Sequence, residues 1–131
     1  TEMYLGILPD WLLTLAERLH ADGLTQEVPN QVIVNEYMPG QGIASHIDCI
    51  PCFRGAIVSL SLGSPCVMLY THTAKKLEVP VLLAPRSLVV MDGEARHEWK
   101  HGIPARKTDV FDGQTFRRGT RVSITFRNVI F

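Results

Sequence analysis

Net charge, long apolar runs and internal repeats are all lacking in this sequence of 131 residues. Its 13 Lys and Arg residues are balanced by 13 Asp and Glu residues. Because proteins that contact many phosphates usually carry a basic excess, composition alone does not indicate a nucleic-acid-binding protein. No apolar run is long enough to cross a bilayer, which argues against a membrane protein.

Cysteine is also scarce, since the chain has only 3: Cys49, Cys52 and Cys66. An odd set without a secretory signal does not indicate a disulfide framework, and it favours a reducing intracellular compartment, the cytoplasm or the nucleus. Cys49 and Cys52 do have the Cys-x-x-Cys spacing of redox and zinc sites. No second such pair and no βαβ context accompany them, which argues against both interpretations.

Hydrophobic residues make up 46% of the chain, enough to bury one core. We therefore expect a single domain over residues 1–131. The chain begins with Thr1 rather than Met, so we expect this domain to be a core excised from a longer protein.

Leucines recur at helical spacing after Pro9 and predict a helix over about 9–22, ending near Gly23. From about residue 30 onward, short strands are separated by Gly and Pro without intervening helices. This pattern predicts a mainly β protein, a sandwich or jelly roll, with a supporting N-terminal helix. The polar, glycine-bearing segment 108–119 is expected to be a mobile loop. The predicted strands cover about 31–38, 56–62, 66–71, 79–83, 87–91, 100–103 and 121–128.

His46 and Asp48 are separated by one residue, so on an extended segment both side chains point to the same side. A third ligand would have to come from another strand, and His101 lies where a short strand can supply it. Two imidazoles and one carboxylate are the facial set that holds non-haem Fe(II) and leaves coordination positions open. Taken alone the spacing is a weak signal, because many such histidines are simply satisfied polar residues.

Near the C-terminus, Arg121, Ser123, Thr125 and Arg127 alternate with apolar residues and therefore share one face of a strand. Arginine binds carboxylates through two parallel hydrogen bonds, so two arginines on one face suit a dicarboxylate. The alternative is an ordinary half-exposed strand with its polar residues turned to solvent.

Asn35 and Tyr37 lie on one face of the predicted strand at 31–38, just before a Pro39-Gly40 turn. Each offers a neutral hydrogen-bond donor that complements an arginine around a bound acid. A strand edge with solvated polar groups is the alternative here.

Six segments of the chain occur in a familiar order and span nearly all of residues 30–128. They are Asn35-Glu36-Tyr37 with Pro39-Gly40, His46-Ile47-Asp48, Ile57 to Gly63, Gly93 to Arg96, His101-Gly102-Ile103 and Arg121 to Arg127. Together they resemble the AlkB-type Fe(II)/2-oxoglutarate dioxygenases. Segments 34–37, 39–43, 46–48 and 58–64 most resemble the eukaryotic branch that hydroxylates a modified wobble uridine of tRNA.

The resemblance implies the double-stranded β-helix of that family, which is a jelly roll. It also implies that His46, Asp48 and His101 bind Fe(II). Ile50 departs from the pattern, because the bacterial repair enzyme has an acidic residue there that contacts the methylated base. That departure weakens an expectation of direct repair.

For the co-substrate, the resemblance implies that Arg121, with Asn35 and Tyr37, binds the distal carboxylate of 2-oxoglutarate. Arg127 is implied to lie by the end of 2-oxoglutarate that chelates iron. Ser123 stands where the repair enzymes carry Asn; its hydroxyl still serves co-substrate binding, and the change favours the tRNA-modifying branch.

Around these residues, Glu94 and Arg96 precede His101 and are expected to orient it. Phe53 follows the His-x-Asp motif and is either a platform for an extruded base or a buried anchor. Cys49 directly follows Asp48, so its oxidation would reach a candidate iron ligand. The basic pairs Lys75-Lys76, Arg106-Lys107 and Arg117-Arg118 form either a basic rim for nucleic acid or merely solvated loops.

These observations predict an oxidoreductase that uses Fe(II), 2-oxoglutarate and O2 on a nucleic-acid substrate, most simply tRNA, with DNA as a further possibility. Hydroxylation at a stable carbon leaves an alcohol, whereas at a carbon attached to nitrogen it leads to demethylation. The alternatives are therefore an oxidative demethylase of N-alkylated DNA or RNA bases and, from another class, a catalytically silent interaction module. We expect a monomer.

Overall fold

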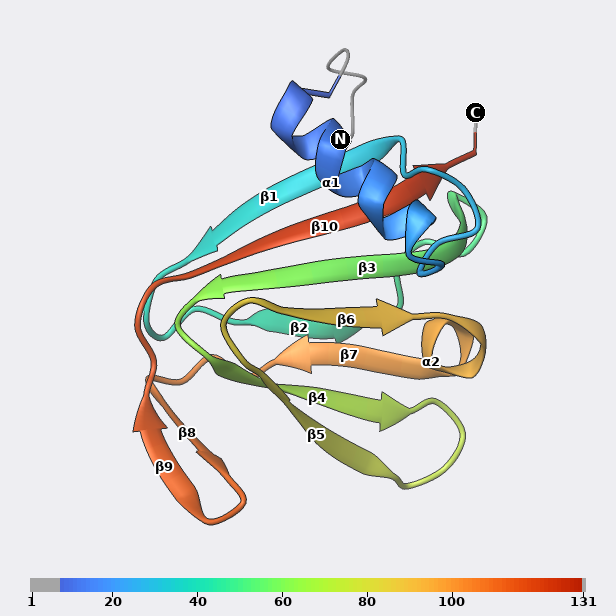
Figure 1. Cartoon of the computed structure of the whole chain (residues 1–131). Coiled ribbons are helices and arrows are strands. Elements are labelled where there is room, and N and C mark those ends of the chain that lie inside the picture. The colour runs from blue at the N-terminus through green and yellow to red at the C-terminus, as the bar shows by residue number, and fades with distance from the viewer. Residues whose placement is uncertain (1–7, 131) are drawn as a thin grey trace.

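The computed structural model describes residues 8–130 of the chain. Within this range the chain forms a mainly β structure with a helix near its N-terminus, as predicted (Figure 1). The elements are α1 (Asp10–Ala21), β1 (Gln31–Tyr37), β2 (Ile43–His46), β3 (Phe53–Gly63), β4 (Cys66–His72), β5 (Glu78–Leu83), β6 (Ser87–Met91), α2 (Gly93–His97), β7 (Trp99–Ile103), β8 (Thr108–Phe111), β9 (Gln114–Arg117) and β10 (Arg121–Val129).

Two antiparallel sheets of four strands each make up the body of the fold. The major sheet has the order β1-β10-β3-β6, and the minor sheet has the order β2-β7-β4-β5. Figure 1 shows the hairpin of β8 and β9 extending from one end of this pair. Apart from the β4–β5 hairpin, which stays in the minor sheet, successive strands from β1 to β7 alternate between the two sheets, which is the arrangement of the predicted jelly roll.

Helix α1 covers the outer face of the major sheet (Figure 1). Its buried side chains, Leu12, Ala16 and Leu19, recur at helical spacing and pack against β3 and β10. The helix ends where Gly23 takes a φ of +80°. There the N–H of Leu24 donates to the carbonyl of Leu19 at 2.9 Å, the closing bond of a Schellman motif. The predicted bounds of 9–22 each exceed the observed helix by one residue.

Strand β10 shows most clearly how sequence alternation builds the site. Its apolar residues, such as Ile124 and Phe126, are buried beneath α1. Its polar residues face the other way, into a cavity between the two sheets: Arg121, Ser123, Thr125 and Arg127. The predicted polar face is therefore turned inward, and the alternative of a solvent-facing strand is wrong.

The segment 108–119, expected to be a mobile loop, is instead the hairpin of β8 and β9. Asp112 and Gly113 both have positive φ, at 50° and 76°. An Asp-Gly pair of this kind forms the tight turn that suits two antiparallel strands. Asp109, on β8, is fully buried, so this hairpin is anchored to the core.

Strand β2, of 4 residues, and helix α2, of 5 residues, were not among the predicted elements. β2 pairs with β7, and α2 leads into β7. Neither helix in residues 8–130 has the length and apolar character that crossing a bilayer requires.

Candidate active site

A cavity of about 140 Å³ lies between the two sheets. Apolar side chains such as Met68 and Leu83 form part of its wall. The structure brings together in this cavity all the site residues predicted from the sequence: His46, Asp48, His101, Asn35, Tyr37, Arg121, Ser123 and Arg127.

The two histidines and Asp48 form a compact cluster at one end of the cavity. The pairing of β2 with β7 places His46 directly opposite His101. Asp48 Oδ1 lies 3.0 Å from His46 Nε2 and 3.8 Å from His101 Nε2. One donor atom from each of the three residues lies within 4.8 Å of the others, so the three can hold a metal ion.

Close packing of β2 on β7 depends on Gly102. A Cβ atom at this position would lie 2.9 Å from the backbone of Ser45, which is closer than packed atoms approach one another. The absence of a side chain next to His101 therefore allows the strand that carries His46 to approach.

The hydrogen bonding of His46 and the burial of His101 suit metal binding. His46 Nδ1 lies 2.7 Å from the carbonyl oxygen of Ala44, which can only accept, so Nδ1 donates. In the neutral imidazole, Nε2 then presents its lone pair to the Asp48 carboxylate, and a cation between them satisfies both. Burial lowers the pKa of His101 despite the opposing effect of Asp48, which keeps this imidazole neutral and able to bind metal.

Arg121 forms the opposite end of the site. It is only 4% exposed, and its Nη2 donates to Ser61 Oγ at 2.9 Å. Its guanidinium carbon lies 5.4 Å from the centre of the Tyr37 ring. Among residues 8–130, no carboxylate lies within ion-pair distance of Arg121, and its Nε has no hydrogen-bond partner. A buried cation without an anion is costly, so the geometry suits an anionic ligand.

Ser123 and Asn35 lie between these two ends. They face each other across the β1–β10 pairing, and Ser61 lies opposite Ser123 on β3. Ser123 is buried, whereas Asn35 is exposed even though it lines the cavity. Ser123 and Asn35 thus offer uncharged hydrogen-bonding groups on the cavity side of β10 and β1, and their role in binding an acid stays a prediction.

Arg127 connects the polar face of β10 to the metal-binding cluster. Its Nη1 lies 3.9 Å from Asp48 Oδ2. The guanidinium carbon also lies 4.3 Å from the centre of the Phe53 ring, which is a cation–π distance. Phe53 packs at the edge of the core. Of its two predicted roles, the structure favours the anchor, here of Arg127, over the platform for a base.

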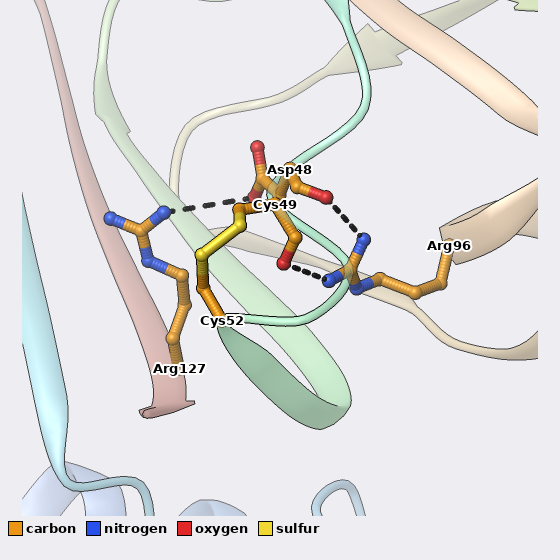
Figure 2. Close-up of a disulfide and its surroundings, with 5 residues drawn as sticks. All are labelled: Asp48, Cys49, Cys52, Arg96 and Arg127. Carbon is orange, nitrogen blue, oxygen red and sulfur yellow. Dashed lines mark hydrogen bonds and ion pairs between the residues drawn. A yellow bond between two sulfur atoms is a disulfide. The ribbon is translucent and has the colours of Figure 1, made fainter. Parts of the chain in front are cut away.

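Arg96 contacts a different part of the cluster from the one expected. Its Nη1 donates to the backbone carbonyl of Asp48 at 2.8 Å, and its Nη2 donates to that of Cys49 at 3.0 Å. Figure 2 shows Arg96 and Arg127 approaching this segment from opposite sides. The prediction that Arg96 and Glu94 orient His101 is therefore wrong: Arg96 fixes the Asp48 backbone, and Glu94 accepts from the Trp99 indole at 2.8 Å.

A family model described as the 2OG-Fe(II) oxygenase superfamily matches residues 5–127. The chain belongs to this superfamily. This membership confirms the expected family, and the superfamily in general uses Fe(II), 2-oxoglutarate and O2.

Several curated proteins are similar to this oxygenase over most of its length. An uncharacterised protein, L905, of Acanthamoeba polyphaga mimivirus is 41% identical over 124 residues, covering 94% of the chain and 59% of that protein. The tRNA (carboxymethyluridine(34)-5-O)-methyltransferase alkbh8 of Xenopus tropicalis is 41% identical over 140 residues, covering 95% of the chain but 22% of that protein. The chain thus spans between about a fifth and three fifths of these relatives. The name of the Xenopus tropicalis relative supports the AlkB-type relationship.

Solved structures support the same architecture. The structure of OsALKBH1 matches with a TM-score of 0.65 at 20% identity, over 92% of the chain and 64% of that protein. A prolyl-4-hydroxylase of Pseudomonas putida matches with a TM-score of 0.59 at 19% identity, over 98% of the chain and 72% of that protein. At these identities the likeness concerns the fold alone, and it confirms the jelly roll.

Tyr70 is a cavity residue of the oxygenase that sequence reasoning missed. It faces His101 across β4 and β7, with ring centres 6.0 Å apart. Burial, and secondarily the charge of Asp48, raise the pKa of Tyr70 to about 12, so the hydroxyl keeps its proton. Among the described residues this buried hydroxyl has no hydrogen-bond partner. No motif indicated it, because β4 otherwise has the composition of an ordinary core strand.

The cysteines also differ from expectation. Cys49 and Cys52 are joined by a disulfide, whereas Cys66 is free and buried. The redox interpretation of the Cys-x-x-Cys spacing, which the sequence disfavoured, therefore regains support. The bond lies immediately after Asp48 (Figure 2).

The predicted basic rim is smaller than its sequence suggested. Arg118 is 8% exposed and binds the carboxylate of buried Asp109 through two of its nitrogens. Arg106 donates to the same carboxylate at 2.8 Å. Arg118 thus serves the core, and Arg106, although its side chain is 44% exposed, is paired with the same buried anion. The members of the basic pairs without such a buried anion are Lys75, Lys76, Lys107 and Arg117.

Proposed function

We propose that this chain is an Fe(II)- and 2-oxoglutarate-dependent dioxygenase that hydroxylates a modified base of tRNA. The observation that carries the proposal is the placement of His46, Asp48 and His101 in the same cavity as the buried guanidinium of Arg121. A metal-binding set and an unneutralised cation in one cavity suit a metal ion together with a small acid.

The residues present fit both groups. His46, Asp48 and His101 would hold Fe(II), because two neutral imidazoles and a carboxylate are its usual facial ligands. Arg121 would bind the distal carboxylate of 2-oxoglutarate, assisted by Asn35 and Tyr37. Loaded in this way, the site supplies oxidative decarboxylation of 2-oxoglutarate to succinate, coupled to insertion of one oxygen atom into a C–H bond of the substrate.

The protein itself holds the charged side chains in place and surrounds them with apolar groups. Ser61 accepts a hydrogen bond from Arg121 and so fixes the direction of the guanidinium. Arg127, held on the Phe53 ring, keeps positive charge beside Asp48 at the metal end. Apolar side chains such as Met68 and Leu83 in the cavity wall make the surroundings less polar than water, which strengthens charge interactions inside the cavity.

Several observations favour tRNA as the substrate. Relatives with about 40% identity are named for a tRNA modification at uridine 34. Ser123 departs from the pattern of the repair enzymes in the direction of that branch, and Ile50 departs from it in a way that weakens direct repair. We also propose that residues 1–131 act as one catalytic domain within a longer intracellular protein, and that the domain itself is monomeric.

A second candidate is oxidative demethylation of an N-alkylated base. A protein of Danio rerio that is 29% identical is named a probable RNA/DNA demethylase, ALKBH6. The same site residues serve either outcome, because only the atom bonded to the hydroxylated carbon decides whether the product collapses to an aldehyde and a free amine.

One experiment separates the candidates. The protein is incubated with Fe(II), 2-oxoglutarate and total cellular RNA, and in parallel with alkylated DNA, and the nucleosides are compared by mass spectrometry. We expect a modified uridine in tRNA to gain one oxygen atom. Release of formaldehyde in step with succinate would instead establish the demethylase, and absence of succinate under all conditions would reject the dioxygenase, leaving a catalytically silent module.

A further inference from the structure

The loop of residues 49–52 holds the backbone of a candidate metal ligand between two separate anchors. On one side, Arg96 donates to the carbonyls of Asp48 and Cys49. On the other side, the N–H of Ile130 donates to the carbonyl of Cys52 at 2.9 Å, which ties the loop to the end of β10. The Cys49–Cys52 disulfide joins the two sides (Figure 2).

The anchor on the Asp48 side is the guanidinium of Arg96, and burying this cation costs free energy. Arg96 is only 3% exposed, and among residues 8–130 no carboxylate lies within ion-pair distance of it. Its guanidinium is used to hold two backbone carbonyls, and burial of a cation for this purpose is unfavourable unless those carbonyls must stay in place. The position of the Asp48 backbone is thus strongly specified by its surroundings.

The disulfide is accessible to solvent. Cys49 is exposed and Cys52 is half-buried, whereas the third cysteine, Cys66, is 3% exposed. The Cα atoms of Cys49 and Cys52 lie 5.2 Å apart, within the range that a disulfide spans. A small thiol can therefore reach this bond, while Cys66 is protected in the core.

We propose that Cys49 and Cys52 form a thiol–disulfide site that controls how firmly Asp48 is held for its metal. The proposal rests on the metal-binding role given to Asp48 under the proposed function. With the disulfide formed, the segment after Asp48 is fixed at both anchors. With the disulfide reduced, Cys49 and Cys52 stay linked only by the backbone and by the 3.3 Å hydrogen bond from the Cys52 N–H to the Cys49 carbonyl, so the Cys52 anchor constrains the Asp48 side less firmly.

The reactants on the other side of the exchange are low-molecular-weight thiols and their disulfides. Two thiol molecules break the Cys49–Cys52 bond and form one S–S bond with each other, and their two protons and two electrons pass to the cysteine sulfurs. The reverse reaction, with a small disulfide as oxidant, restores the loop. In a reducing compartment the disulfide then forms only transiently, when the two thiols are oxidised.

The test measures metal binding without turnover. Apo protein is prepared with the disulfide formed and, under argon, after reduction and removal of the reductant, and Mn(II) affinity is measured by calorimetry. Thiol alkylation and mass spectrometry report the state of each cysteine. Because the loop is short and acts on the ligand from outside the coordination sphere, we expect reduction to weaken Mn(II) binding about tenfold.

Two variants sharpen the measurement. Cys66→Ala serves as the matched control and should respond to reduction as the wild type does. The double variant Cys49→Ser with Cys52→Ser should bind Mn(II) as the reduced wild type does, whatever the redox conditions. The wild-type comparison needs no substitution, so a variant that misfolds leaves the test intact.

Equal Mn(II) affinity in the two redox states of the wild type would overturn the proposal. So would failure of Cys49 and Cys52 to form a disulfide with a small disulfide oxidant, or a redox response that persists in the double variant. A redox-dependent affinity without any succinate formation would count against the proposed function alone. Normal succinate formation with a redox-independent affinity would count against this inference alone.

Discussion

Asp48 and Asp109 are two carboxylates near arginines, and their surroundings differ sharply. All four hydrogen bonds to the Asp109 carboxylate come from the protein: two from Arg118, one from Arg106 and one from the N–H of Val67. The nearest guanidinium nitrogen to the Asp48 carboxylate, on Arg127, is 3.9 Å away. Asp48 instead faces two imidazoles and a cavity.

The difference shows how to distinguish a structural ion cluster from a functional one. The Asp109 cluster is saturated, so no acceptor is left for a ligand and its loss leaves buried cations without an anion. The Asp48 cluster still has polar atoms that can bind an added ligand, and so has Arg121 at the other end of the cavity. An incomplete polar cluster that opens on a cavity is where an added metal or acid completes the interactions.

The largest effect on stability should come from breaking the saturated cluster. Asp109→Ala leaves Arg118 buried without its anion and should reduce the free energy of unfolding by about 3–5 kcal/mol. Asp48→Ala, the matched control, should reduce it by less than about 1 kcal/mol, because no guanidinium hydrogen bond to that carboxylate is lost. Urea unfolding of both variants checks the pair, and equal losses would contradict the distinction between the clusters.

The next largest effect concerns binding at the other end of the cavity. Arg121→Ala should weaken binding of 2-oxoglutarate by about 2–5 kcal/mol, because a carboxylate in a buried site loses its charged partner. Arg121→Lys should restore only part of the affinity, since the planar fork is lost. Calorimetric titration with 2-oxoglutarate in the presence of Mn(II) measures both, and wild-type affinity in Arg121→Ala would show that the acid binds elsewhere.

Low pH should reduce the folding stability that the Asp109 cluster contributes. Burial raises the pKa of Asp109, but hydrogen bonds from Arg118, Arg106 and the Val67 N–H outweigh it and hold the pKa below its usual value. The unfolded chain then binds the proton first, so this stabilisation is complete above the usual aspartate pKa and is lost as the pH falls through the folded one. Stability curves below about pH 4 should therefore fall less steeply in Asp109→Asn than in the wild type.

The smallest predicted effect concerns Tyr70, which lines the same cavity as the Asp48 cluster. Tyr70→Phe removes a buried hydroxyl without a partner in the described residues and should leave folding stability unchanged or slightly higher. If that hydroxyl donates to a bound acid or substrate, the variant should lose about 0.5–1.5 kcal/mol of transition-state stabilisation in kcat/KM. Unchanged kinetics together with raised stability would make Tyr70 a core residue only.

Much of the fold and the site could be predicted because both depend on alternation along strands. The period of two in β10 predicted which residues face inward, and the packing of the two sheets against each other places Arg121 and Arg127 in the same cavity as the histidines. The His-x-Asp spacing likewise predicted that His46 and Asp48 point to the same side, although β2 itself ends at His46. The helix was predictable from leucine spacing and from Gly23.

What could not be predicted depends on contacts between distant segments. Arg96 and Asp48 are 48 residues apart, and no local pattern shows that one holds the backbone of the other. The unpartnered hydroxyl of Tyr70 likewise depends on the packing of β4 against β7. The hairpin of β8 and β9 is different, because its Asp112-Gly113 turn was visible in the sequence and the polar composition around it was given too much weight.

The central claim is that the Asp48 cluster holds the metal on which activity depends, whereas the Asp109 cluster holds the fold. The most direct test is the conversion of 2-oxoglutarate to succinate without added substrate, measured with Fe(II) and O2 in the wild type and in His101→Ala, together with thermal unfolding of both. We predict that His101→Ala forms succinate only at the metal-free background rate and unfolds at nearly the wild-type temperature. Wild-type succinate formation by a folded His101→Ala protein would contradict the account.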